Sequence, residues 1–273
     1  MALEGRLLSR ISRLNRAFSL IESGDRVMVA CSGGKDSWAM LHLLRHYVTR
    51  LPFPVSIVAM NLDQGQPGFE ADRLRAHFER EGIEYEMAYA DTYSVVIEQT
   101  PEGKTFCSRC SRMRRGILHR VAAKPGANKI ALGHHRDDLV ETLLMNMMFS
   151  GRLRTMPPKL EAEGEGAAVI RPLLWCAEDD LGAYAQTCDV PILPCNLCGT
   201  QPNTQRRRVK ALLAELERDN PRLRENLLAS AGNVEPDHLL DQDLVRRLAN
   251  APASDDCGAT PPARLRVIVD PVA

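Results

Sequence analysis

The sequence predicts an α/β protein with a doubly wound, mainly five-stranded parallel sheet, an N-terminal helix and C-terminal helices. Two observations lead to this fold class. Short apolar runs without alternation recur between residues 26 and 173, and most are followed by a segment with helical periodicity. Strands covered on both faces are apolar throughout, and helical crossovers connect parallel strands. With 44% hydrophobic residues, the chain can also bury a sizeable core.

The elements follow this alternation in order. The first strand ends in a Gly-Gly turn, and a polar connection after the third strand leads into a basic helix near 108–123. The acidic start of the last helix of the sheet region suits the positive end of its dipole. The expected strands are 26–32, 55–63, 85–91, 128–135 and 167–173, and the other expected helices lie around 36–50, 69–81, 137–149 and 177–188.

Helices are also expected at both ends of the chain. The N-terminal segment carries apolar residues from Leu3 to Ile21 at helical spacing, with arginines between them. Packing of this amphipathic helix on the main domain is the favoured interpretation, and an arginine row that faces RNA is the alternative. Further helices are expected around 204–219, 221–233 and 236–249, before a tail rich in Ala, Pro and Asp.

Composition limits the class of protein. No apolar run approaches the roughly 20 residues that span a bilayer, and the charged N-terminus has no signal-peptide core. A cytoplasmic protein without a membrane partner is therefore expected. Four of the eight cysteines form two CxxC pairs, which favours metal binding or redox chemistry over disulfides. The other four, which we interpret as small buried or incidental residues, are Cys31, Cys176, Cys188 and Cys257.

Charge is unevenly distributed along the chain. The 35 basic residues balance the 35 acidic ones, which argues weakly against a nucleic-acid partner. However, residues 104–124 contain seven Lys or Arg and no acid, and residues 199–210 contain four and again no acid. A single such cluster is usually a solvated face. Two clusters, each beside a CxxC pair, indicate phosphate contacts.

The segment CSGGKDS, at 31–37, lies where the first strand passes into its helix. In doubly wound folds this junction binds phosphate, because backbone N–H groups and the helix dipole converge there. Its spacing is neither that of a Walker A loop nor that of a dinucleotide fingerprint. The candidate ATP-binding residues are Ser32, Gly33, Gly34, Lys35, Asp36 and Ser37: the glycines allow close approach, Lys35 neutralises charge and the serines donate hydrogen bonds.

These residues resemble the PP-loop ATP pyrophosphatases, whose signature is SGGxDS after the first strand. A second stretch, GHHRDDLVET at 133–142, is similar to the segment of that family after its fourth strand. There Asp137, Asp138 and Glu141 either hold Mg²⁺ on the ATP phosphates or shape the pocket. The resemblance implies that ATP is cleaved between its α and β phosphates to adenylate a carbonyl oxygen.

The cysteine pairs at 107/110 and 195/198 would, taken alone, indicate a four-cysteine zinc site. Two strand–helix units separate the pairs, however, whereas zinc ribbons keep their pairs roughly 15–20 residues apart. The ligands would therefore come from distant parts of one folded domain. Such a recessed, preformed site is better suited to chemistry than to holding a small finger together.

Within the PP-loop proteins, this layout resembles the bacterial tRNA 2-thiocytidine synthetases. The matching pieces include the two motifs above, CxxC at 107–110, IRPLL at 170–174 and PCNLCGTQPNTQR at 194–206. The resemblance implies a [4Fe–4S] cluster, ATP with Mg²⁺, a tRNA whose cytidine 32 becomes 2-thiocytidine, sulfur from a cysteine desulfurase, and a homodimer. It assigns catalytic roles to Lys35 and Asp36.

The resemblance also implies which cysteines hold the cluster. Most [4Fe–4S] centres use four thiolates, and spacing alone would assign all four cysteines. An iron that is open to sulfide requires three, and comparison of PCNLCG with the family pattern selects Cys107, Cys110 and Cys198. Cys195 would then be a neighbour that is structural or handles sulfur. The reverse choice of Cys195 over Cys198 remains open at this point.

Three other functions account for parts of this sequence. A tRNA lysidine synthetase would need no cysteine pairs, and an archaeal-type tRNA thiouridine synthetase would carry additional zinc-binding pairs. A zinc-stabilised RNA-binding protein without catalysis is the alternative from another class. The expected organisation is an N-terminal helix at 1–24, a PP-loop domain carrying the Fe–S site at 25–200, a helical extension at 201–250 and a disordered tail at 251–273.

Overall fold

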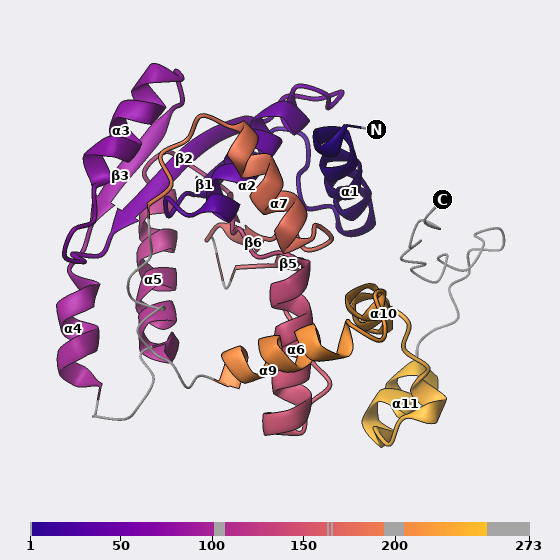
Figure 1. Cartoon of the computed structure of the whole chain (residues 1–273). Helices are drawn as coiled ribbons and strands as arrows, with labels where there is room; N and C mark the ends of the chain where they lie inside the picture. Colours follow the sequence, from indigo (N-terminus) through magenta and orange to yellow (C-terminus); the bar gives the residue numbers. More distant parts are fainter. Residues whose placement is uncertain (1, 101–106, 163, 165, 194–204, 250–273) are drawn as a thin grey trace.

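The computed structural model describes residues 2–100, 107–162, 164, 166–193 and 205–249, with the backbone alone at 107–112 and 249. Six strands form one sheet in the order β3-β2-β1-β4-β6-β5 (Figure 1). The expected tail at 251–273 lies outside the described residues. The strands are β1 (Arg26–Ala30), β2 (Ser56–Asp63), β3 (Tyr85–Tyr89), β4 (Lys129–Ala131), β5 (Lys159–Leu160) and β6 (Ala168–Ile170).

Helices connect and extend this sheet. Most lie where helical periodicity predicts them, and α4 lies in the connection that was expected to be only polar. Asp91 is the N-cap of α4: its side chain accepts a hydrogen bond from the backbone N–H of Ser94. The helices are α1 (Leu3–Phe18), α2 (Lys35–Val48), α3 (Ala71–Arg80), α4 (Thr92–Gln99), α5 (Cys107–Ala122), α6 (Arg136–Ser150), α7 (Glu178–Thr187), α9 (Gln205–Leu216), α10 (Leu223–Ser230), the short η1 (Pro236–His238) and α11 (Gln242–Ala249).

The predicted parallel sheet is confirmed. Strands β3, β2, β1, β4 and β6 pair in parallel, and β5 adds a two-residue antiparallel edge on β6 that the sequence did not predict. Chain order reverses at β1, which lies between β2 and β4. In open α/β sheets such a reversal leaves a crevice at the carboxyl ends of the strands, where ligands bind. The CSGGKDS loop begins at this point.

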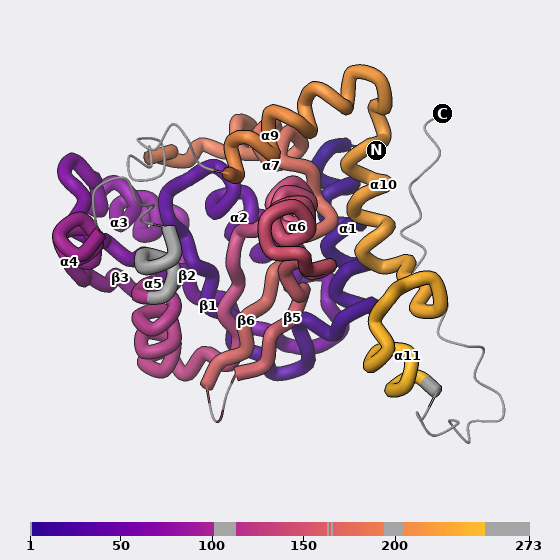
Figure 2. Tube along the Cα trace, turned by 90° about the horizontal axis from the view of Figure 1, so that it is seen from below, coloured from indigo at the N-terminus to yellow at the C-terminus, as the bar shows by residue number. Residues whose placement is uncertain are grey.

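Apolar side chains cover both faces of the sheet. On one face Val27, Val29 and Ala59 pack in a cluster with α1, α2, α3 and α7. On the other, Met28 and Val58 pack against α5. Figure 2 shows α5 on one side of β1 and β2, and α2 and α3 on the other. This two-sided cover explains why the strands are apolar runs without alternation.

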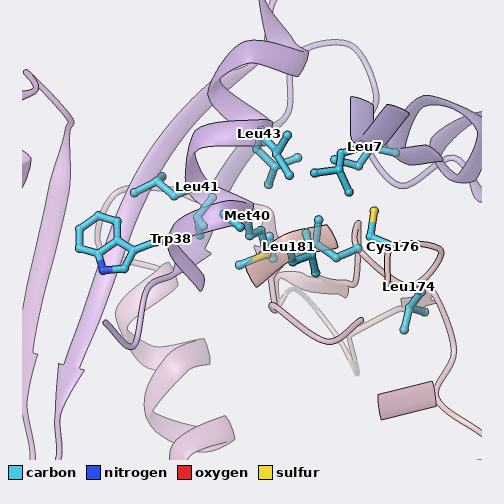
Figure 3. Packing of buried hydrophobic residues seen from close by; sticks show 14 of the residues in the cluster. Leu7, Trp38, Met40, Leu41, Leu43, Leu174, Cys176 and Leu181 are labelled. Carbon is cyan, nitrogen blue, oxygen red and sulfur yellow. The ribbon is translucent and has the colours of Figure 1, made fainter. Parts of the chain in front are cut away.

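Helix α1 is an integral part of the larger core. Its apolar side packs against the core: Leu7, Leu8, Ile11 and Leu14 are all buried, and Figure 3 shows Leu7 near Leu43 of α2. Three of its four arginines contact other groups of the protein. Arg6 and Arg10 form ion pairs with Asp180 of α7, and the guanidinium of Arg13 lies 5.9 Å from the Trp175 ring centroid. The packing interpretation is therefore the correct one for these three arginines.

The described residues contain no helix that is both long and apolar enough to cross a bilayer.

We predict that Leu14→Ala lowers the free energy of unfolding by about 2–5 kcal/mol, because this fully buried side chain would leave a cavity between α1 and the rest of the core. Urea denaturation measures the change. The control is Leu216→Ala, at a side chain that is 46% exposed, which should cost under about 0.5 kcal/mol. Equal, small losses in both variants would show that α1 contributes little to the stability of the core.

Candidate active site

The CSGGKDS segment forms a tight turn between β1 and α2. Gly33 has a φ of 86°, and a Cβ at this position would lie 3.2 Å from the side chain of Leu193. The same leucine donates its backbone N–H to the Gly33 carbonyl at 2.9 Å. Ser37 closes the turn by donating its hydroxyl to the carbonyl of Gly34 at 2.8 Å. The turn therefore requires glycine at position 33 and leaves the first turn of α2 facing the crevice.

Lys35 makes ion pairs with two carboxylates. Its ammonium lies 2.9 Å from Asp36 Oδ1 and 3.2 Å from Glu178 Oε1. Burial alone would lower the pKa of Lys35, but the two carboxylates outweigh burial, and its pKa is raised above its ordinary value. The side chain is therefore cationic at neutral pH, as a phosphate-binding role requires.

Glu178, at the start of α7, is a site residue that the sequence analysis treated only as an acidic helix start. Its second oxygen accepts a hydrogen bond from Lys210 of α9 at 2.7 Å. Burial would raise the pKa of Glu178, but Lys210 and Lys35 lower it to about 2. One carboxylate thus connects the phosphate loop to the C-terminal extension.

Asp137, from the second motif, joins three helices. Its Oδ2 accepts the backbone N–H of Glu178 at 2.8 Å, and its Oδ1 accepts Arg224 Nη1 of α10 at 2.9 Å. Both oxygens are satisfied by protein donors. Although burial would raise the pKa of Asp137, Arg136, the Glu178 N–H and Arg224 keep it below its ordinary value. Of the two roles left open for Asp137, the geometry supports shaping of the pocket.

Asp138 and Glu141 share one arginine of α9. Arg206 Nη1 lies 2.9 Å from Asp138 Oδ1 and 3.0 Å from Glu141 Oε2. Burial raises the pKa of Glu141 despite this pair. Figure 1 shows α9 crossing α6, which carries both carboxylates. Two basic residues of the 199–210 cluster, Arg206 and Lys210, thus neutralise carboxylates of the protein.

The two histidines of the second motif differ in role. His135 forms a capping box at the start of α6: its side chain accepts the Asp138 N–H, and the Asp138 carboxylate accepts the His135 N–H. His134 is partly buried, and its Nδ1 has no partner among the described residues. Burial lowers the pKa of His134 to about 4. The charge of Asp138 acts to raise this pKa, and the charges of Arg171 and Arg206 lower it further. It is therefore neutral at physiological pH.

A cavity of about 510 Å³, which we call the phosphate-loop cavity, lies at the carboxyl ends of β1, β2 and β4. Ser32, Gly34, Asp36 and Ser37 line one wall, and Lys35 lies outside the lining because it turns toward Glu178. Apolar side chains of β2 and the start of the second motif line other walls. The remaining lining residues include Met60, Leu62, Gly133, His134, and the α5 residues Arg114, Arg115 and Leu118.

The cysteines are divided between described and undescribed residues. Cys107 and Cys110 occupy the first turn of α5. Cys110 precedes Arg114, which lines the cavity, by four residues, or about 6 Å along the helix axis. Cys195 and Cys198 lie outside the described residues, as does Cys257. Cys31 and Cys176 are buried, and burial raises the pKa of each thiol to about 12. Cys31 and Cys176 are thus small buried residues, as predicted.

No group of three or more described His, Cys, Asp or Glu residues is arranged to hold a metal ion. In the part of the chain that the structure describes, the carboxylates near the phosphate loop, such as Asp36 and Asp138, already have partners. A divalent ion at this site would therefore need ligands from a bound phosphate as well.

Comparison with known proteins identifies the class. Residues 7–193 match the family of PP-loop domains, so the chain is a PP-loop protein. A curated tRNA-cytidine(32) 2-sulfurtransferase of Anaeromyxobacter sp. (strain Fw109-5) is 53% identical over 248 residues, which are 91% of this chain and 82% of that protein. One from Ralstonia pickettii (strain 12J) is 51% identical over 242 residues, 89% and 77% of the two chains. The chain belongs to the tRNA-cytidine(32) 2-sulfurtransferase family, which confirms the identification made from its motifs.

A solved structure supports the fold. The U34-tRNA thiolase NcsA from Methanococcus maripaludis, determined with its [4Fe–4S] cluster, superposes with a TM-score of 0.61 at 23% sequence identity. The match covers 82% of this chain and 76% of that one. At this level of identity the likeness shows the fold alone.

We predict that Glu178→Gln destabilises the protein at pH 7, because Lys35 and Lys210 lose their shared carboxylate. A lowered carboxyl pKa stabilises the fold above the unfolded-state value near 4.5, and this contribution is lost as pH falls toward about 2. The difference in unfolding free energy between wild type and Glu178→Gln should therefore shrink across that range.

Denaturant titrations at several pH values measure this difference. Asp179→Asn, at an exposed carboxylate in the same helical turn, makes the same chemical change and should show a smaller effect at pH 7. A difference for Glu178→Gln that stays constant down to pH 2 would contradict the assigned ion pairs.

Proposed function

We propose that this chain transfers sulfur to carbon 2 of cytidine 32 in tRNA, after ATP adenylates the oxygen at that carbon. The observation that carries the proposal is the composition of one cavity. The SGGKDS loop forms one wall, and helix α5, which begins with the CxxC pair, supplies Arg114 and Arg115 to another. Nucleotide chemistry and cysteine chemistry thus meet at one edge of the sheet.

The phosphate loop holds the leaving group of the adenylation. Oxygen on a cytosine ring leaves poorly. Transfer of the adenylyl group of ATP to this oxygen, with release of pyrophosphate, lets it leave as AMP. Backbone N–H groups at the start of α2 and the hydroxyls of Ser32 and Ser37 bind the pyrophosphate that departs. Lys35 exchanges its contacts with Asp36 and Glu178 for the phosphate charge, and Lys210 remains with Glu178.

The donor set suits a [4Fe–4S] cluster. Cys107 and Cys110 lie three residues apart in one helical turn, so they share a face of α5. The segment with Cys195 and Cys198 is flanked by Leu193, bonded to Gly33, and by Arg206, paired with Asp138. Both flanking residues lie at the carboxyl edge of the sheet. Helix α5 also begins at this edge, because a crossover helix runs antiparallel to the strands that it connects. Thiolates are the ligands that such clusters require.

When bound, the cluster would supply an iron site that carries sulfide to the activated carbon. The residues of the chain position the substrate for that attack. Arg114 and Arg115 are exposed and line the cavity wall nearest the CxxC pair, where guanidinium groups can hold RNA phosphates. We assign Cys107, Cys110 and Cys198 as the ligands and leave Cys195 beside them.

Other parts of the proposal complete the reaction. Mg²⁺ would neutralise charge on the ATP phosphates. Asp36, the carboxylate in the lining of the phosphate-loop cavity, would hold it together with the phosphates. A cysteine desulfurase supplies the sulfur, the protein acts as a homodimer, and the reaction takes place in the cytoplasm. Each of these follows from the family resemblance.

The proposal predicts that cells lacking this protein contain no 2-thiocytidine in tRNA, that the wild-type chain restores it and that Lys35→Ala does not. Loss of the ammonium group should reduce tRNA-dependent pyrophosphate release by about 10²–10³-fold, since it removes one charge that stabilises the transition state. Nucleoside analysis of digested tRNA and a pyrophosphate assay provide the measurements. Unchanged 2-thiocytidine in the deletion strain would overturn the function itself.

A second prediction separates the cysteines. After anaerobic reconstitution, Cys107→Ala, Cys110→Ala and Cys198→Ala should each lose iron and the visible absorbance of the cluster. Cys195→Ala should retain both, and Cys188→Ala serves as a control at a half-buried cysteine of the sheet domain. Loss of iron from Cys195→Ala and retention by Cys198→Ala would show that the third ligand was chosen wrongly. Loss from both would contradict a cluster with an open iron.

A further inference from the structure

A second cavity adjoins the phosphate-loop cavity and plays no part in the function proposed above. Its volume is about 760 Å³, within the range of about 300–1,000 Å³ typical of ligand pockets. We call it the side cavity. It is lined by α6, by residues 154–160, by Trp175 and by the end of α10. Three residues line both cavities and so mark their common boundary: Arg115, Met156 and Arg171.

Arg171 has an unusual environment. It follows β6 directly, only 9% of it is exposed, and its Nη1 donates to the carbonyl of Pro157 at 2.7 Å. Its Nε has no hydrogen-bond partner in the described part of the chain. Burial and the positive charge of Arg115 together lower the pKa of Arg171.

Every other buried charged side chain of the described residues has a charged or strongly polar partner. Lys129 pairs with Glu22 and Asp25, and Arg224 pairs with Asp137 and Glu217. Among residues 2–100, 107–162, 164, 166–193 and 205–249, Arg171 has no carboxylate within ion-pair distance, whereas buried Lys129 and Arg224 each have two. Buried charges are normally paired, because a guanidinium loses much of its hydration when it leaves water. An anionic ligand would supply the missing partner.

The lining of the side cavity indicates the class of ligand. It contains three arginines and no Asp or Glu, with Phe18, Trp175 and Met156 among its apolar residues. Asn146 and Thr142 add polar groups. The adjoining segment, residues 151–160, holds exposed Arg152 and Arg154 and again no acid. Cations beside aromatic and apolar surface suit a nucleotide, whose phosphate is anionic and whose base is flat.

We propose that the side cavity binds one nucleotide of the RNA substrate, with its phosphate on Arg171 and Arg115 and its base against the apolar wall. The inference rests on the proposed function, which makes RNA the substrate. ATP is already provided for by the SGGKDS loop on the other side of the boundary. A nucleotide held on these two arginines would place the neighbouring RNA residue at the mouth of the phosphate-loop cavity.

Direct binding measurements test this proposal. The variants are Arg115→Gln, Arg171→Gln and Arg171→Lys, and Ala231→Trp adds bulk at the rim of the side cavity without touching either arginine. Arg73→Gln, on α3 and away from both cavities, makes a matched change of charge. The probes are an unmodified tRNA transcript with cytidine at position 32, titrated at several salt concentrations, and ATP titrated separately.

Arg115→Gln and Arg171→Gln should each weaken tRNA binding about tenfold. Arg115→Gln should also reduce, by about one, the slope of the logarithm of the tRNA binding constant against the logarithm of salt concentration. Arg171→Lys keeps the charge but loses the planar guanidinium group, so its tRNA affinity should lie between those of wild type and Arg171→Gln. Ala231→Trp should weaken tRNA binding alone. The ATP affinity of Ala231→Trp, and both affinities of Arg73→Gln, should stay within twofold of wild type. Because Arg115 and Arg171 also line the phosphate-loop cavity, their variants should weaken tRNA binding by a larger factor than ATP binding.

Two results would overturn the proposal. Weaker ATP binding with unchanged tRNA binding would assign the arginines to the phosphates of ATP. Unchanged affinities for both probes would leave Arg171 a structural residue that holds Pro157. If Arg171→Gln fails to fold, exposed Arg115 and Ala231 still decide the outcome. A wild-type protein that binds tRNA through these residues but transfers no sulfur would refute the proposed function while leaving this inference standing.

Discussion

The arrangement of the site depends on one buried carboxylate, that of Asp137. Its two oxygens accept from the first N–H of α7 and from an arginine of α10, so three helices that are distant in sequence meet at one point. The position of Glu178 follows from the first of these bonds, and the direction of Lys35 follows from Glu178. Without Asp137 the N-terminus of α7 would have no fixed relation to α6, and Arg224 would be left as a buried, partly unpaired charge. A residue that makes no contact with the cavity thus determines how the cavity is lined.

Around this point carboxylates of the protein neutralise the cations of the site. Lys35 is held by Asp36 and Glu178, Lys210 by Glu178, and Arg206 by Asp138 and Glu141. Each pair keeps a long side chain oriented at low cost, because the charges are only partly removed from water. An incoming triphosphate adds negative charge beside cations that already have partners. Binding must therefore be an exchange of ion pairs, and its net energy is smaller than the sum of the new contacts.

Local patterns were sufficient to predict the sheet, the phosphate loop and the family, because each depends on residues close together in the chain. Apolar runs predicted five strands, and the Gly33 turn predicted the phosphate site. The two-residue strand β5 was missed since it is formed only by pairing with β6, and α4 was missed because its residues 92–99 lack a clear apolar stripe. The roles of Glu178 and Arg206 could not be predicted, because their ion-pair partners lie tens of residues away in the chain. The role of Arg171 could not be predicted either, since it has no carboxylate partner among the described residues. The RRRVK segment is the clearest example. A run of cationic residues has the same sequence pattern whether it binds phosphate or pairs with carboxylates of the protein.

Helix α9 has a consequence for how ligand states communicate. Arg206 lies just after the segment with Cys195 and Cys198, and it is held by Asp138 and Glu141 of α6. A divalent cation that bound Asp138 or Glu141 would compete with Arg206 for the same oxygens. Thermodynamic reciprocity then requires that whatever strengthens the hold of α9 on α6 weakens the affinity of those carboxylates for a cation, by the same factor. Cation binding at Asp138 and Glu141 and the contact of α9 with α6 are in this way coupled in one equilibrium.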